Sequence, residues 1–342
     1  MTFKAFSGKL IVWAFVSLAT SSAVMGAALQ NTQTQDKGPA ISQEESNALK
    51  KVQSATDPAA RQQAAAEYIK KYPKSAMRPR VAGFMVGKIS EIQDPAQKIA
   101  SAKSFLSVFT EPSEAEMINP TLLDAYIKAN RLDDAFQLAS TMTAKNPNDV
   151  ATLTQMALIG IDQVRRQNTK FAQQGQQFGT KAIELIEADK KPATMDAALW
   201  AQYKTRWLPQ LYQSVGLVAL MNQNSADARA KFEKAAALDP SDPLTFALLG
   251  QINRDEYQQM AQQYKSMAAG AEKDALLKKI ETQIDKIIDL YAHAIALSEG
   301  KPQYQPLKDQ VMPELQDLYK FRHQNSTEGL QQLIDKYKKP TQ

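Results

Sequence analysis

The segment 209–242 constrains the fold most tightly, because small and large residues recur within it at helical spacing. Gly216 and Ala228 are small, which suits the point where two antiparallel helices about 8–10 Å apart would touch. Tyr212 and Phe232 supply bulk on either side of that contact. A proline near the end of the segment cannot continue a helix. This spacing predicts a helical hairpin.

A second hairpin begins in phase with the first. Asp242 is suited to cap a helix, and Pro243 suits the first turn, where a missing N–H costs nothing. Gly250 repeats the small residue of the first helix, but Tyr291, the counterpart of its aromatic partner, arrives much later in the sequence. We therefore predict an elongated hairpin over 243–297.

Two apolar stripes are expected to face each other in the elongated hairpin. The first consists of Tyr257, Met260, Tyr264 and Met267, and the second of Leu277, Ile280, Ile284, Ile287 and Tyr291. We interpret both as the core of the hairpin. The alternative is a projecting tip whose methionines form an adaptable contact surface.

The rest of the chain from Ser42 onward also has helical periodicity. Apolar residues recur every three or four positions, helix-favouring residues dominate, and no stretch of alternating β-branched residues occurs. Weaker hairpins are indicated before and after the two clear ones, including a unit over 116–149. A last hairpin over 305–339 is expected to cap the array, because the end of a repeat array must cover its apolar face. The prediction is an all-α fold.

The 209–242 unit resembles the tetratricopeptide repeat superfamily, and the whole chain is similar to exported bacterial proteins built from irregular repeats of this kind. The residues that carry the resemblance are Tyr212, Val215, Gly216, Ala219, Ala228, Phe232, Ala235 and Pro240. The resemblance implies a right-handed α-α superhelix, a solenoid of helical hairpins over 42–342. It also implies that the first helix of each hairpin lines a concave groove, which holds a peptide or an extended segment of a partner protein.

The resemblance also supplies candidate groove residues wherever the repeat register is clear. These candidate partner contacts are Asp124, Ile127, Lys128, Gln210, Gln213, Leu217, Leu220, Met221, Gln251 and Arg254. Superfamily members that grip C-terminal carboxylates carry Lys and Asn at the positions of Gln213 and Leu217, so we do not expect that specialisation. A solvated helix face explains the polar candidates equally well.

An aromatic cluster and two glycines have competing interpretations. Trp200, Tyr203, Trp207 and Tyr212 could stack on a ligand, but their spacing favours packing against a neighbouring repeat. Pro209 lies among them, which predicts either one kinked helix or two consecutive helices. We interpret Gly83 and Gly87 as close-packing residues.

The N-terminal segment 1–28 has the order of a secretory signal. It carries Lys4 and Lys9, then an apolar stretch over 10–19, then small and polar residues. We expect cleavage after one of residues 26–28 and a flexible leader over 29–41. The mature chain is then expected in the periplasm or outside the cell. The alternative is an uncleaved membrane anchor, the one route by which a membrane partner is expected.

The charge balance argues against nucleic acid as a partner. The sequence has 41 Lys and Arg against 36 Asp and Glu, for a formal charge of +5. Removal of Lys4 and Lys9 with the signal leaves 39 basic residues against 36 acidic ones, which is nearly neutral for a chain of this length. Proteins that bind nucleic acid concentrate cations on one face or stripe.

Composition also argues against catalysis, metal binding and cofactors. The chain has no Cys, and its two His, His293 and His323, are 30 positions apart. Such a set leaves little for a zinc site or for an imidazole base that activates a nucleophile. No Walker loop, dinucleotide fingerprint or nucleophile elbow occurs. Acidic pairs such as Asp133 and Asp134 lie on helices that we expect to face solvent, whereas a catalytic carboxyl group needs burial to bring its pKa into a useful range.

Three functions follow from these observations. The first is a non-enzymatic scaffold of the cell envelope that holds a protein or peptide partner in a concave groove, without a small-molecule cofactor. The second is an enzyme, or an enzyme subunit, that acts on envelope polymers. The third is a structural protein that assembles with copies of itself.

Overall fold

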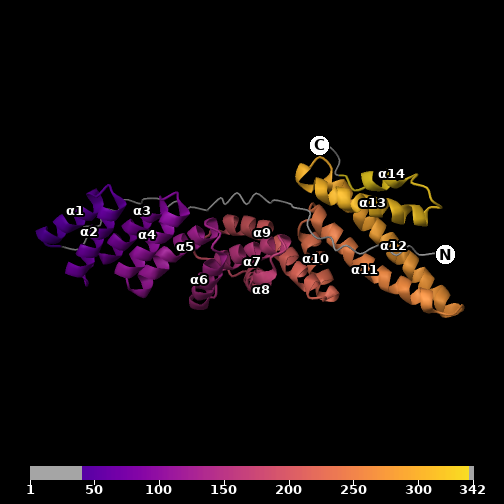
Figure 1. Cartoon of the computed structure of the whole chain (residues 1–342), viewed down its shortest axis with the longest axis horizontal. Helices are drawn as coiled ribbons and strands as arrows, with labels where there is room; N and C mark the ends of the chain where they lie inside the picture. The colour runs from indigo at the N-terminus through magenta and orange to yellow at the C-terminus, as the bar shows by residue number, and fades with distance from the viewer. Residues whose placement is uncertain (1–40, 339–342) are drawn as a thin grey trace. The chain divides into compact units, whose positions relative to one another are not determined.

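A computed structural model describes residues 41–338, and the regular structure within this range is entirely helical (Figure 1). The predicted all-α fold is confirmed for these residues. The helices of the first part are α1 (Gln43–Ser54), α2 (Pro58–Lys71), α3 (Arg78–Ser90), α4 (Pro95–Val108), α5 (Pro112–Lys128) and α6 (Leu132–Lys145). The predicted signal over 1–28 and the leader over 29–41, except for its last residue, lie outside the described residues.

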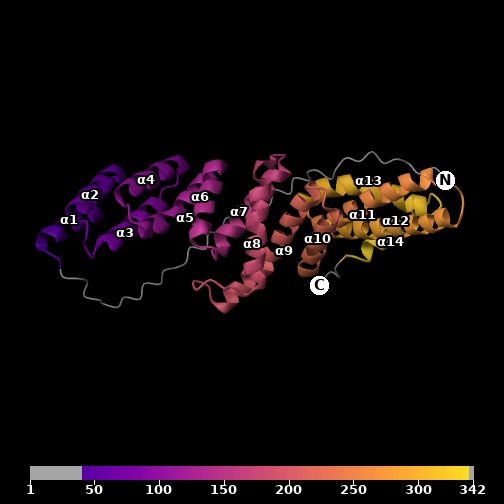
Figure 2. The same cartoon turned by 90° about the horizontal axis from the view of Figure 1, so that it is seen from below.

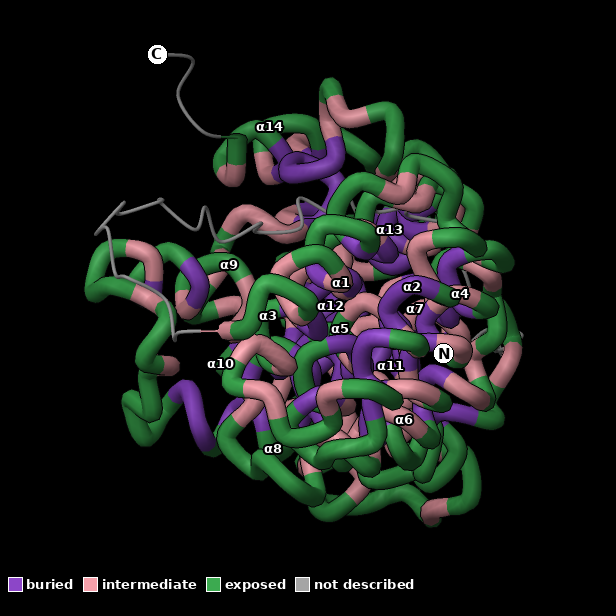
Figure 3. The backbone as a smooth tube through the Cα atoms, turned by 90° about the vertical axis from the view of Figure 1, so that its left-hand side faces the viewer, coloured by how far each residue is buried: buried purple, intermediate pink, exposed green. Residues whose placement is uncertain are grey.

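The helices of the second part include two long ones and two short 3-10 helices. They are α7 (Val150–Arg165), η1 (Thr169–Phe171), α8 (Ala172–Glu187), α9 (Ala197–Met221), α10 (Ser225–Leu238), α11 (Pro243–Ser266), α12 (Ala271–Ser298), η2 (Pro302–Tyr304), α13 (Gln305–Arg322) and α14 (Leu330–Asp335). The sequence predicts a single array over 42–342, whereas contacts divide the described residues into two units, 41–147 and 148–338. Figure 3 shows buried and exposed stretches alternating along the helices, as amphipathic helices require.

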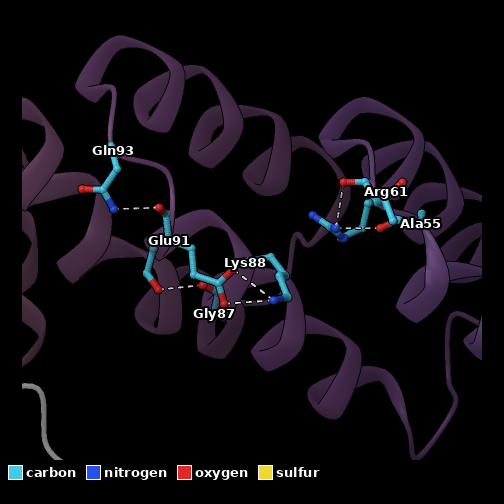
Figure 4. Close-up of polar contacts among 8 residues, drawn as sticks. Ala55, Arg61, Gly87, Lys88, Glu91 and Gln93 are labelled. Carbon is cyan, nitrogen blue, oxygen red and sulfur yellow. Dashed lines mark hydrogen bonds and ion pairs between the residues drawn. The ribbon is translucent and has the colours of Figure 1, made fainter.

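Side chains close the turns of the unit 41–147 (Figure 4). The Nη2 atom of Arg61 donates to the backbone oxygen of Ala55 at 2.6 Å, which fixes the turn between α1 and α2. At the end of α3, Lys88 pairs with Glu91 at 2.9 Å. The amide of Gln93 donates to the backbone oxygen of Glu91 at 2.9 Å. The contacts of Arg61 and Gln93 satisfy backbone carbonyl groups that a helix end leaves without partners.

A buried ion pair joins α3 to α5. Arg78 donates from Nε to Oε1 of Glu114 at 2.6 Å and from Nη2 to Oε2 at 2.9 Å. Their side chains are 12% and 5% exposed. The guanidinium and carboxylate planes thus meet in the two-point geometry that is the strongest form of this contact.

Glycines behave differently in the two units. A Cβ atom added to Gly216 would lie 2.7 Å from the ring of Phe232, and one added to Gly250 would clash with the ring of Tyr291. Both contacts confirm the predicted hairpin packing. The interpretation of Gly83 and Gly87 as close-packing residues is wrong. A Cβ on Gly87 would meet nothing within 4 Å, and one on Gly83 would make an ordinary contact of 3.6 Å.

The first clear hairpin consists of α9 and α10. Helix α9 runs unbroken through Pro209 and is 25 residues long, so of the two alternatives one continuous helix is correct. The 209–242 unit therefore begins inside a helix. Trp200 and Tyr203 stack with ring centroids 5.5 Å apart, and both are buried. This agrees with the packing interpretation of the aromatic cluster.

The second clear hairpin, α11 and α12, has nearly the predicted bounds of 243–297. Asp242 caps α11 by accepting the backbone N–H of Thr245 at 3.0 Å. Tyr257, Ile280, Ile284, Ile287 and Tyr291 are buried in one core, with Met260, Tyr264 and Leu277 packed against it. The two stripes thus form the core of the hairpin, as predicted, except for Met267, which follows the end of α11 and is not part of this core.

The C-terminal helices α13 and α14 cover α12. Leu330 and Ile334 of α14 are buried in the same core as α12. Helix α14 begins at Leu330. Its preceding residue is Gly329, with a left-handed φ of 87°.

Candidate partner-binding surface

The three candidates on α5 lie at its C-terminal end. Asp124 and Ile127 are half-buried, and Lys128 is exposed. The ammonium group of Lys128 lies 2.8 Å from Oδ2 of Asp124, one helical turn away. Both charges are therefore available at the surface but compensate each other.

The five candidates on α9 share one face of the helix but differ in exposure. Gln210, Leu217 and Leu220 are half-buried, and Met221 is 37% exposed. Gln213, in the middle of the face, is buried. Met221 is thus the candidate on α9 that is most accessible to a partner.

Gln213 is buried because it connects three helices. Its Oε1 accepts a hydrogen bond from Nη2 of Arg165 on α7 at 2.8 Å. Its Nε2 donates to Oδ2 of Asp242 at 2.6 Å and to Oγ1 of Thr245 on α11 at 2.9 Å. The hydroxyl of Thr245 in turn donates to Oδ2 of Asp242 at 2.6 Å. The polar groups of Gln213 are therefore used within the chain, where they hold α7, α9 and α11 together.

The two candidates on α11 are also buried. Gln251 is 1% exposed and Arg254 is 6% exposed. Arg254 lies 2.9 Å from Asp255 and 3.5 Å from Glu314 of α13. Burial raises the pKa of Glu314, and the charge of Arg254 opposes that shift. The guanidinium of Arg254 thus serves as an internal partner, and contact between any of the ten candidates and another protein stays a prediction.

A more accessible surface arises because neighbouring helices differ in length. Helix α10 has 14 residues, whereas α12 has 28. Near the start of α10, Arg229 lies 2.7 Å from Glu256 of α11. The chain of α11 continues to Ser266, about 15 Å beyond Glu256 at the usual helical rise. Figures 1 and 2 both show α11 and α12 extending past α10.

An open groove lies between α11 and α12 beside the start of α10, and we refer to it as the hairpin groove. Its volume is about 620 Å³. From α11 it is lined by Glu256, Gln259, Met260 and Gln263. From α12 it is lined by Lys278, Lys279, Thr282, Gln283 and Lys286. The groove thus combines one apolar side chain with several amides and cations.

The charges of the hairpin groove are unbalanced. Lys278, Lys279 and Lys286 are exposed, and none of them is within ion-pair distance of a carboxylate in the described part of the chain. Glu256 is already engaged, because it pairs with Arg229 and accepts a hydrogen bond from Nε2 of Gln283 at 2.8 Å. The free charge of the groove is positive.

At Gly216 and again at Gly250, a small residue of one helix contacts an aromatic ring of the next helix. No protein-family model and no curated protein matches the chain. Among solved structures, the chain is similar to a tetratricopeptide repeat protein from Parabacteroides merdae ATCC 43184, with 14% identity and a TM-score of 0.35. The match covers 79% of this chain and 100% of that one.

The sequence gives a partial signal for the hairpin groove. Lys279 and Lys286 are two helical turns apart and therefore share a face of α12, as any helical projection shows. The projection does not show that the start of α10 leaves them uncovered, because that depends on which residues pair across the hairpins. The groove lysines were therefore not among the predicted contacts.

Within residues 41–338, no three or more His, Asp or Glu side chains gather closely enough to hold a metal ion. In the same range, every helix is too short or too polar to cross a bilayer.

Proposed function

We propose that this chain is a non-enzymatic scaffold of the cell envelope that binds a protein partner on the surfaces of its helical hairpins. The observation that carries the proposal is the hairpin groove, an uncovered surface on a well-packed base. Ile280, Ile284 and Ile287 beneath it are fully buried. A rigid base has little conformational entropy of its own to lose when a partner binds.

The chemistry of the groove favours binding over catalysis. General acid–base catalysis needs a titratable group that reaches the substrate and has a pKa near the working pH. The lining offers lysines, amides and Met260, and its carboxylate, Glu256, is held by Arg229. Glu314, whose pKa is raised by burial, is not part of the lining and faces Arg254.

Site-specific crosslinking tests the proposal. A photo-reactive amino acid is placed at Gln259 or Thr282, which are exposed in the groove, and at Glu233 on the exposed side of α10 as a control. We expect an adduct with a defined protein from the groove positions and none from Glu233. A further position at Met221 tests the predicted concave groove.

Other crosslinking results would contradict the proposal. Adducts solely between copies of this chain would support the self-assembling alternative. Release of soluble products from envelope polymers by the purified chain would support the enzyme alternative. Identical adducts from Gln259 and Glu233 would mean that the groove has no special role.

The envelope location rests on the pattern of residues 1–28 and needs its own test. Cell fractionation and N-terminal sequencing of the chain are expected to find it outside the cytoplasm, beginning directly after one of residues 26–28. A chain that retains Met1 and sediments with membranes would support the anchor instead.

A further inference from the structure

The hairpin groove is continuous with the surface of α11 and α12 on which α10 packs. Phe232 and Ala228 of α10 pack against Leu248 and Ile252 of α11, and Leu290 of α12 packs against the same cluster. Helix α10 thus packs on α11, and Leu290 of α12 belongs to the same apolar cluster. This part of the surface of the hairpin is therefore occupied by a helix, α10.

The boundary between the occupied and open parts is marked by polar contacts. Arg229 of α10 donates to Oδ1 of Asn253 at 3.3 Å. Gln283 of α12 donates from Nε2 to the same Oδ1 at 2.9 Å and to Glu256 at 2.8 Å. Glu256 and Gln283 also line the hairpin groove. The open part therefore begins beside the start of α10.

The open part differs from the occupied part in charge. In the occupied part, Phe232 of α10 is fully buried among apolar side chains. The lining of the open part includes Lys278, Lys279 and Lys286 and a single apolar side chain, Met260. Cations without partners favour a ligand that brings carboxylates, because electrostatic complementarity selects partners and speeds their association.

We propose that the hairpin groove receives an acidic amphipathic α-helix of a partner protein, lying in line with α10. This inference rests on the proposed function and names the chemistry of the partner. An apolar residue of the incoming helix contacts Met260, and carboxylates at helical spacing face Lys278, Lys279 and Lys286. Helix docking into a groove is a common mode of recognition between proteins.

A synthetic peptide tests this proposal directly. The probe is a fluorescent helix of about 16 residues, long enough to span the open groove at the usual rise, with Glu on one face and Leu on the other. One comparison peptide has Lys in place of Glu, and another has the same composition in scrambled order. We expect the acidic helix to bind more tightly than both, with an affinity that falls as salt is added.

Charge-reversed variants locate the binding site. The combined variant Lys278→Glu, Lys279→Glu and Lys286→Glu should weaken binding of the acidic helix by at least about tenfold, because three attractive contacts become repulsive. The matched control reverses Lys145, Lys190 and Lys234, which are also exposed and do not belong to the groove lining. Its net charge changes equally, and its affinity should stay within about twofold. Circular dichroism checks that both variants remain folded.

Several outcomes would overturn the acidic helix as occupant. Equal losses in the two triple variants would show general charge attraction, and equal binding of the scrambled peptide would show that helical order is irrelevant. Stronger lysine-dependent binding to vesicles with anionic lipid, or to a single-stranded oligonucleotide, would assign the groove to another class of ligand.

The proposed function and the acidic helix fail in different ways. A protein adduct at Gln259 that persists in the groove triple variant, together with no peptide binding, would remove the acidic helix and leave the scaffold function standing. Absence of both adduct and peptide binding would remove both.

Discussion

Gly160 of α7 and Gly175 of α8 bring two helix backbones into direct contact. A Cβ atom added to Gly160 would lie 2.8 Å from the Cα atom of Gly175, closer than van der Waals contact allows. A backbone atom cannot move aside as the end of a flexible side chain can. The distance between these two helices is therefore set by the absence of side chains at both positions.

Gly160→Ala is expected to destabilise the unit 148–338 by about 1–3 kcal/mol, the usual cost of overpacking a tight contact. Chemical denaturation followed by circular dichroism measures the change. Gly87→Ala, at a helical position with open space around it, is expected to raise the free energy of unfolding by about 0.5–1 kcal/mol, because alanine has the higher helix propensity. Equal effects of the two substitutions would show that the Gly160 contact is not constraining.

Arg78→Ala is expected to cost about 3–5 kcal/mol in the unit 41–147, because it leaves the buried carboxylate of Glu114 without a partner. Arg78→Ala with Glu114→Gln should recover part of this loss, since the amide carries no charge. Denaturant unfolding of the single and double variants measures both. If the double variant is no more stable than Arg78→Ala, the uncompensated charge is not the cause.

The ion pair also predicts a dependence on pH. Burial alone would raise the pKa of Glu114, but hydrogen bonds from Arg78 and the backbone of Glu111 lower it overall. Because the folded chain holds this proton less tightly than the unfolded chain, the stabilisation is present above the ordinary pKa of 4.5 and is lost as pH falls below it. Unfolding curves measured between pH 6 and pH 3, roughly the range that spans this titration, should show a smaller loss in Glu114→Gln than in the parent chain.

Asp242→Ala is expected to destabilise the unit 148–338 by about 2–4 kcal/mol, because it removes a helix cap and the acceptor for Gln213 and Thr245. Asp242→Asn keeps an oxygen for the cap and should cost roughly half as much. Thermal unfolding compares the two. Amide exchange at the backbone N–H of Thr245 should accelerate more in Asp242→Ala, and equal acceleration in both variants would contradict the role of the cap.

His293 predicts a second dependence of stability on pH, at higher pH than that of Glu114. Its ring lies between Phe246 and Tyr337, with centroids 3.8 Å and 4.3 Å away. Burial lowers its pKa from the ordinary value of 6.5, although the charge of Asp289 opposes the shift. The unfolded chain therefore takes up the proton first, and stability decreases as pH falls from about 6.5 through the lower folded pKa. His293→Phe should lack this decrease, and a parallel decrease in parent and variant would assign it to other groups.

The parts of the fold that sequence predicts well are those with local causes. The Gly216 and Phe232 contact, the Asp242 cap and the extent of the α11–α12 hairpin all follow from periodicity, capping chemistry and turn residues. Gln213 and Arg254 show the limit. Their positions in the repeat suggest an exposed groove, but their burial comes from Arg165, Thr245 and Glu314, which other helices bring to them. The hairpin groove has the same kind of cause, since it depends on where α10 begins.

The unequal lengths of α10 and α12 have a consequence for how such a chain can change over evolutionary time. Each hairpin in an array depends on its immediate neighbours. Whole helical turns can therefore be inserted or deleted where α11 and α12 extend past α10, without disturbing the Gln213 contacts. The length of the hairpin groove and its selectivity for partners can then change without a loss of stability in the rest of the chain.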